Sequence, residues 1–125
     1  MKVLVLGAGN MGLTYAEGMA NSPFLNKRKL MIFDVSPQKT EALSTMAQFD
    51  AYDSIEECVP QADVIFIAVK PYHSQSLFDS IKPYINQDQL FVSLMAGVTI
   101  NTIQEGLGVK KVIRTIRHTD SSYNI

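Results

Sequence analysis

Short apolar runs rich in valine, isoleucine, leucine and phenylalanine alternate along the chain with longer amphipathic stretches. The apolar runs have the length of β-strands, and the stretches between them have the spacing of helices. The pattern predicts six strands, at Val3–Leu6, Lys29–Phe33, Gln48–Tyr52, Val64–Val69, Leu90–Leu94 and Lys111–Arg114. It predicts helices at about Asn10–Asn21, Pro37–Ala47, Ser54–Pro60, Ser74–Ile85 and Ile100–Leu107.

This alternation indicates a parallel sheet with crossover helices, because no long linker interrupts it. Val64–Val69 has six apolar residues without alternation, so we expect both of its faces to be covered, as in the middle of such a sheet. The first helix is expected to turn Met11, Tyr15, Gly18 and Met19 inward. The last ten residues, Ile116–Ile125, are polar and have no clear period, so we expect an irregular tail there.

Composition narrows the class of protein. A chain of 125 residues with 46% apolar and 18% charged residues fits one globular domain. Its net charge of −1 gives no electrostatic footprint for nucleic acid or an anionic membrane. No run approaches the roughly 18 apolar residues of a membrane span, and the start does not resemble a signal peptide. The single Cys58 excludes an intrachain disulfide and fits a reducing compartment. We therefore expect a cytoplasmic protein.

A glycine-rich segment, Gly7-Ala8-Gly9-Asn10-Met11-Gly12, follows the first strand and opens the first helix. A GxGxxG in this context is typical of dinucleotide binding. The first glycine permits the tight turn, the second lets the backbone approach the pyrophosphate, and the third lets the helix pack on the sheet. Amides at the helix N-terminus, from Asn10 and Met11 onward, would hold the diphosphate. The alternative is a turn that merely connects strand to helix. We expect an α/β fold: a Rossmann-type doubly wound parallel sheet with helices on both faces, over residues 1–115.

Asp34 ends the second strand, 22 residues after Gly12. This is close to the roughly 20 residues expected for the acid that binds the ribose hydroxyls. A carboxylate there repels a 2′-phosphate, so we expect NADH to be preferred over NADPH. Ser36 and Lys39 lie just beyond and could instead meet a phosphate, so use of both cofactors stays open. The structural alternatives are that Ser36 only caps the next helix and that Lys39 is only solvated.

Two other strand ends are candidate cofactor contacts, since ligands of open α/β sheets bind outside the carboxyl ends of the strands. The first is Ala68-Val69-Lys70-Pro71, where the alternative is strand termination with a surface lysine. The second contains Ala96 and Gly97, whose small size would let a planar nicotinamide lie against the backbone. His73, His118 and Cys58 have no metal-site spacing, so we expect no metal. We interpret His73 and His118 as surface and tail residues.

At these residues the chain resembles the pyrroline-5-carboxylate reductase family. The resemblance rests on the opening glycine motif, on Ala68-Val69-Lys70-Pro71, and on Val92-Ser93-Leu94-Met95-Ala96-Gly97-Val98-Thr99, and extends to about residue 115. It implies an oxidoreductase of proline biosynthesis, in which NAD(P)H delivers a hydride to the cyclic imine of 1-pyrroline-5-carboxylate. The imine is already electrophilic, so the protein mainly orients substrate and cofactor. We expect no catalytic residue in this domain.

The match ends at Arg114. The family continues into a Met-Pro-Asn-x-Pro loop and a helical domain that makes the dimer and most substrate contacts, whereas this chain reads Thr115-Ile116-Arg117-His118 and stops at Ile125. We expect a truncated form that binds the cofactor, takes the imine only if a second domain completes it, and turns over poorly alone. The resemblance also leaves a homo-oligomer open. Two alternatives remain. One is another dehydrogenase domain, of the β-hydroxyacid, prephenate or F420-dependent NADP reductase type, and the other is a stand-alone NAD(P)-binding sensor.

Overall fold

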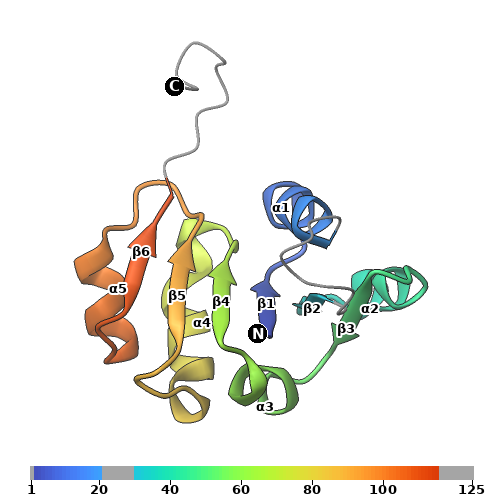
Figure 1. Cartoon of the computed structure of the whole chain (residues 1–125). Coiled ribbons are helices and arrows are strands. Elements are labelled where there is room, and N and C mark those ends of the chain that lie inside the picture. The colour runs from blue at the N-terminus through green and yellow to red at the C-terminus, as the bar shows by residue number, and fades with distance from the viewer. Residues whose placement is uncertain (1, 21–29, 116–125) are drawn as a thin grey trace.

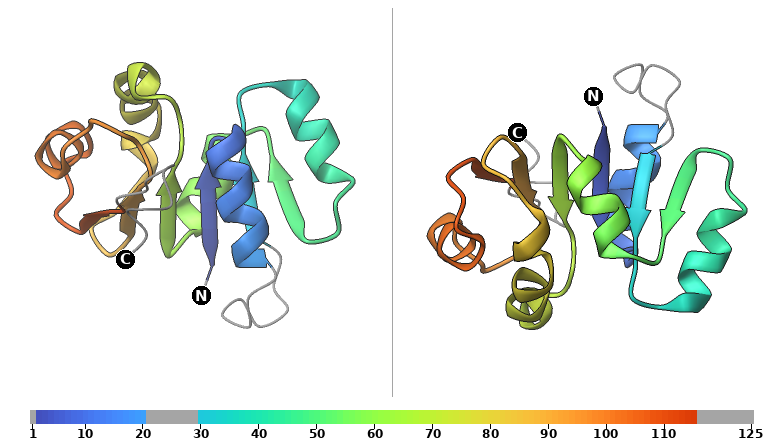
Figure 2. Two further views of the ribbon diagram at one scale, coloured as in Figure 1. Left: turned by 90° about the horizontal axis from the view of Figure 1, so that it is seen from above. Right: turned by 90° about the horizontal axis from the view of Figure 1, so that it is seen from below.

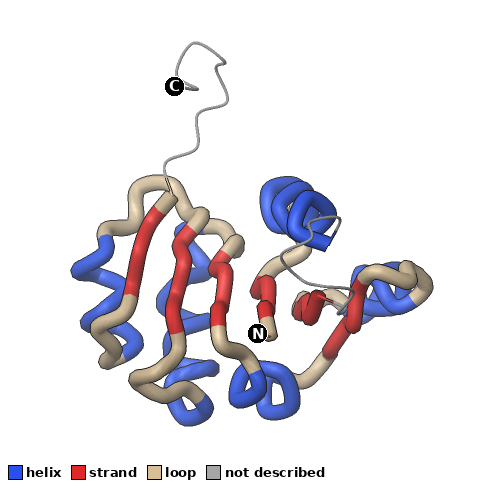
Figure 3. The backbone as a smooth tube through the Cα atoms, in the orientation of Figure 1, coloured by secondary structure: helices blue, strands red, loops and turns tan. Residues whose placement is uncertain are grey.

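The computed structural model describes residues 2–20 and 30–115, and its centre is a six-stranded sheet in which every neighbouring pair is parallel (Figure 1, Figure 3). The strands lie in the order β3-β2-β1-β4-β5-β6. This is the strand order of the dinucleotide-binding α/β folds, and the order reverses between β1 and β4. The predicted fold class is therefore confirmed. The strands are β1 (Val3–Leu6), β2 (Leu30–Phe33), β3 (Phe49–Tyr52), β4 (Val64–Ile67), β5 (Leu90–Ser93) and β6 (Val112–Arg114).

Helices fill the connections between the strands, as the alternating pattern predicts. Ser36 caps the second helix by accepting a hydrogen bond from the backbone N–H of Lys39, and Thr99 caps the last helix in the same way with Thr102. Gly108 ends the last helix in the left-handed conformation, with φ of 72°. The α-helices are α1 (Asn10–Ala20), α2 (Pro37–Ser44), α3 (Ile55–Cys58), α4 (Ser74–Ile81) and α5 (Ile100–Leu107). Short 3-10 turns occur at Val59–Gln61, Pro71–His73 and Lys82–Tyr84.

The sheet separates two hydrophobic cores. On one face, α1 and α2 contribute Ala16 and Leu43 to a cluster with alternate residues of β1, β2 and β3. On the other face, α3, α4 and α5 contribute Cys58, Phe78 and Ile103 to a larger cluster. Seen from above, α1 (blue) lies in front of the strands, and seen from below, α3 (green) does (Figure 2). Successive side chains of a strand point to opposite faces of the sheet. Because helices cover both faces, nearly every strand residue is apolar, and the apolar runs are nearly continuous.

Two packing predictions are wrong in part. Val64 and Phe66 are only half-buried, because α1 packs on β1 and β2 while α2 packs on β3, which leaves this face of β4 less covered. Gly18 is exposed rather than inward. Gly12 and Ala16, four residues apart, form the buried stripe of α1, because small residues allow the helix to approach the sheet closely.

Strand β4 ends two residues earlier than predicted, at Ile67. The backbone N–H of Ala68 still donates to the carbonyl of Leu6 at 2.9 Å, and the chain then leaves the sheet. Ala68–Pro71 is consequently a loop at the carboxyl edge of the sheet. Over the described residues, no helix is both long enough and apolar enough to cross a membrane.

Candidate functional site

The glycine turn lies at the point where the strand order reverses. The backbone N–H of Gly7 donates to the carbonyl of Phe33 on β2 at 2.8 Å, whereas the Leu6 carbonyl accepts from Ala68 on the β4 side. Gly7 has φ of +103°, and a Cβ there would lie 3.0 Å from the backbone carbon and oxygen of Ala68. The turn therefore requires glycine for both its backbone conformation and its contact with the β4 loop.

The two later glycines of the motif differ in their surroundings. A Cβ on Gly12 would overlap the carbonyl oxygen of Gly7 and lie 3.0 Å from the Ala68 Cβ, so this glycine permits the close approach of α1 to the turn. A Cβ on Gly9 would meet nothing within 4 Å. The N–H of Leu13 donates to the Gly9 carbonyl at 2.9 Å and closes the first helical turn. The open space at Gly9, beside the amides that begin α1, suits an anion.

At the end of β2, the Asp34 carboxylate is half-buried and engaged with backbone. Its Oδ2 accepts from the N–H of Ala8 at 2.8 Å, and its Oδ1 accepts from the N–H of Ser36 at 2.8 Å. The Ser36 hydroxyl caps α2, as one of the alternatives above supposes. Lys39 is exposed on the first turn of α2. The sequence-predicted acid thus stands beside the glycine turn and links it to the β2–α2 loop.

A cavity of about 180 Å³ lies at the ends of β4 and β5, next to the glycine turn. Six of the sequence-predicted residues line it: Gly9, Ala68, Val69, Lys70, Pro71 and Ala96. Leu94 and Met95 also line it and were not predicted as contacts, although they stand in the β5 motif beside Ala96. Gly97 is exposed with φ of +75°, and it shapes the β5–α5 loop without lining the cavity. Placement of the Asn10 and Met11 side chains lies outside the described part of the structure.

A second cavity, also about 180 Å³, lies on the α3–α4 side of the same sheet edge. It shares Val69 with the first cavity and is mostly apolar. Sequence reasoning missed it, because its lining comes from three separate connections between strands that only the fold brings together. The residues are Val35, Ile55, Val69, His73, Ser76, Leu77 and Ser80.

His73 lines this second cavity while being exposed to solvent, and its ring lies 4.4 Å, centre to centre, from that of Tyr72. It is therefore a surface histidine at the mouth of a cavity. Cys58 is fully buried in the core under α3 and α4, and burial raises the pKa of its thiol to about 11. This environment is typical of an unreactive cysteine that packs as a small buried hydrophobe. His118 lies outside the described residues.

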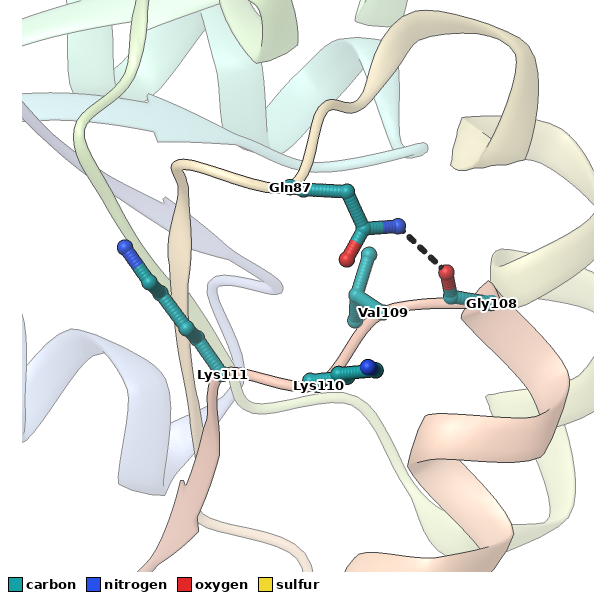
Figure 4. Close-up of a pocket in the computed structure, with 5 residues that line it drawn as sticks. All are labelled: Gln87, Gly108, Val109, Lys110 and Lys111. Atoms are coloured by element: carbon teal, nitrogen blue, oxygen red, sulfur yellow. Dashed lines mark hydrogen bonds between the residues drawn. The ribbon is translucent and has the colours of Figure 1, made fainter.

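A larger hollow, about 590 Å³, lies at the opposite edge of the sheet, at the amino ends of β5 and β6 (Figure 4). Gln87 closes one side of it by donating to the carbonyl of Gly108, and the side chains of Lys110 and Lys111 point in different directions. Ligands of open α/β sheets bind at the carboxyl ends of the strands. Size alone therefore does not make this hollow the functional site.

Comparison with known proteins identifies the family of the chain. A family model described as "NADP oxidoreductase coenzyme F420-dependent" matches residues 2–97. The chain belongs to this family. The match contains the glycine turn, Asp34 and the Ala68–Pro71 loop, and it ends at Gly97.

Individual relatives of the chain have a more specific description. The chain is 37% identical to the pyrroline-5-carboxylate reductase of Staphylococcus haemolyticus, over 93% of this chain and 43% of that protein. It is 33% identical to the Escherichia coli pyrroline-5-carboxylate reductase, over 98% of this chain and 46% of that protein. The resemblance to pyrroline-5-carboxylate reductases is therefore confirmed. The chain spans less than half the length of these relatives.

A solved structure shares the fold. Pyrroline carboxylate reductase of Plasmodium falciparum, crystallised with NADP bound, superposes with a TM-score of 0.76 at 28% identity. The superposition covers 91% of this chain and 41% of that one. A structure of a Coxiella burnetii pyrroline-5-carboxylate reductase reaches a TM-score of 0.80 at 24% identity, over 97% of this chain and 45% of that one. The second likeness speaks for the fold alone.

Proposed function

We propose that this chain is the NAD(P)H-binding domain of an oxidoreductase that reduces the cyclic imine 1-pyrroline-5-carboxylate to proline. The glycine turn carries the proposal. Gly7 and Gly12 pack against each other and against the β4 loop, while Gly9 faces open space beside the start of α1. A turn that only joined strand to helix would not need this open face at the helix N-terminus.

The two small cavities fit the two halves of a dinucleotide. They lie at the same sheet edge, share Val69, and flank the switch in strand order. The nicotinamide would lie in the cavity at the ends of β4 and β5, against Ala96 and the backbone. The adenine would lie in the more apolar cavity between Val35 and Leu77. The diphosphate would bridge the two cavities across Gly9 and the first amides of α1. The sequence-predicted residues that line the cavity at the ends of β4 and β5 keep their place in the proposal, whereas Gly97 only shapes the neighbouring loop.

The substrate assignment rests on the relatives. The relatives are pyrroline-5-carboxylate reductases, whereas the family is that of the F420-dependent NADP oxidoreductases. The β4 and β5 motifs favour the imine reductases. Because this chain matches less than half of each relative, we propose that a further domain completes the substrate side of the nicotinamide. The chain alone should therefore bind cofactor without sustained turnover.

We also propose a preference for NADH. A 2′-phosphate would bring negative charge close to the Asp34 carboxylate, which no Lys or Arg neutralises through a bond among the described residues. The exposed Lys39, five residues further along the chain, is the next cation in sequence. An attraction between it and a 2′-phosphate would oppose the preference for NADH.

A fluorescence titration of the purified chain with NADH and NADPH tests the binding proposal. Enhancement or a blue shift of the nicotinamide emission that saturates at one equivalent supports it, with the lower Kd expected for NADH. A chain that is folded by circular dichroism but binds neither cofactor would rule the proposal out. Tighter binding of NADPH would overturn the preference only. Addition of 1-pyrroline-5-carboxylate to the NADH complex should give no steady oxidation of the cofactor.

A further inference from the structure

The Asp34 side chain joins two loops that are far apart in sequence. Its Oδ2 accepts from the N–H of Ala8 in the glycine turn, and its Oδ1 accepts from the N–H of Ser36 in the β2–α2 loop, both at 2.8 Å. The short separations are typical of hydrogen bonds to an ionised carboxylate. One carboxylate therefore holds two backbone segments at a fixed spacing.

The bond to Ala8 matters because this residue is 7% exposed. A buried backbone N–H without a partner carries a large desolvation penalty, so the turn would rearrange if the carboxylate were removed. Ala8 stands between Gly7, whose conformation is left-handed, and Gly9, which lines the cavity at the ends of β4 and β5. Any rearrangement at Ala8 would move the amides that face this cavity.

The hydrogen bond to Ser36 shapes the loop beside the cavity of the α3–α4 side. Val35, between Asp34 and Ser36, is 85% exposed and lines the cavity of the α3–α4 side. Oδ1 closes a turn around it, a geometry that short acidic side chains favour. Thr40 extends the anchoring, since its hydroxyl donates to the backbone carbonyls of Asp34 and Ser36 at 3.3 and 3.1 Å.

We infer that Asp34 is a positioning residue for the whole dinucleotide site and does not act solely as a selector against the 2′-phosphate. This inference rests on the proposed function, because it assigns the carboxylate a part in binding NADH and NADPH alike. If Asp34 acted only as a selector, removing its charge would weaken the binding of NADH and leave the binding of NADPH equal or tighter. A positioning residue makes the opposite prediction for NADPH. Loss of the two hydrogen bonds to Ala8 and Ser36 weakens the binding of both cofactors, even though a repulsive charge has been removed.

The test is Asp34→Asn in the full 125-residue chain. An asparagine keeps the size but has one acceptor and one donor, so it cannot accept from both N–H groups. We expect Kd to rise by about tenfold for both NADH and NADPH, the scale of one charge-assisted hydrogen bond. The Ala8 amide proton of the cofactor-free chain should also move upfield in a ¹H–¹⁵N spectrum. The matched control is Asp53→Asn, an exposed aspartate after β3, which should change neither readout.

A second variant guards against misfolding of the first. Asp34→Ser can still accept from the Ser36 N–H through its hydroxyl, but it is too short to reach Ala8 as well. It should bind both cofactors as weakly as Asp34→Asn while remaining folded. The inference is overturned if either variant loses NADH affinity and keeps or gains NADPH affinity, or if the Ala8 amide signal is unchanged in both. A wild-type chain that binds neither cofactor would instead defeat the proposed function, and the Ala8 signal would still report on the bridge.

Discussion

Gly12 lies so close to Gly7 that a β-carbon on Gly12 would overlap the Gly7 carbonyl oxygen. The two glycines are five residues apart, one at the end of β1 and the other in the first turn of α1. Their contact brings the start of α1 against the carboxyl edge of the sheet, where Ala68 completes the contact. The motif therefore has a packing role that can be separated from ligand binding.

Gly12→Ala and Gly18→Ala should have opposite effects on stability, although both lie in α1. The first introduces a backbone clash and should lower the free energy of unfolding by about 2 kcal/mol or more. The second adds a methyl group where nothing lies within 4 Å, and should raise it by about 0.5–1 kcal/mol through helix propensity. Urea denaturation followed by circular dichroism measures both. Equal effects of the two substitutions would contradict the packing at Gly12.

Gly9→Ala should separate binding from folding. Its Cβ would project into open space beside the cavity at the ends of β4 and β5, so the free energy of unfolding should change by less than about 0.5 kcal/mol. Cofactor affinity should fall by about tenfold or more, because the methyl group occupies the path of the diphosphate. Gly18→Ala is the control, with unchanged Kd. If Gly9→Ala binds NADH as the wild type does, the diphosphate does not pass there.

Cys58 should react with a disulfide reagent such as dithionitrobenzoate only in the unfolded chain. Burial raises the pKa of its thiol from 9.0 to about 11, so the thiolate fraction at pH 8 falls by about 100-fold. Solvent exclusion slows the reaction further. A folded chain that reacts at the rate measured in urea would show that Cys58 is accessible.

The same shift makes stability depend on pH in a defined direction. The unfolded thiol loses its proton near pH 9 and the folded thiol near pH 11, so the contribution of Cys58 is complete below pH 9 and decreases as pH rises toward 11. Cys58→Ala should flatten this alkaline loss relative to wild type. Comparing the two proteins is necessary because burial also raises the pKa of Tyr52. If the free energy of unfolding falls equally with rising pH in the wild type and in Cys58→Ala, Cys58 is not the source of the alkaline loss.

Much of the fold could be predicted because local signals and tertiary packing agree. The Ser36-Pro37 pair marks the start of α2, and Thr99 marks that of α5. The predicted ends of the strands were less accurate. The apolar character of Ala68 and Val69 extends the run past Ile67, but these two residues face the loop and the cavity. Hydrophobicity alone does not distinguish a residue that lines a site from one that continues a strand.

The glycine turn was predictable because each glycine has its own geometric cause. The bridging role of Asp34 was not, because the spacing locates the carboxylate at the sheet edge but does not indicate which N–H groups it meets. The cavity on the α3–α4 side was missed for a related reason. Val35, Ile55 and Leu77 come from three separate connections, and only the order of the strands brings them together.

The most direct test of the account is to map NADH binding on the ¹⁵N-labelled chain by amide chemical shifts. We expect the largest changes at the turn Gly7–Gly12 and at Ala68–Lys70, with smaller ones at Leu94–Ala96. Gln87 and the segment Gly108–Lys111, around the larger hollow at the opposite sheet edge, should not move. Chemical-shift changes concentrated at that hollow, with none at the glycine turn, would contradict the claim that this domain binds its cofactor at the carboxyl ends of the strands.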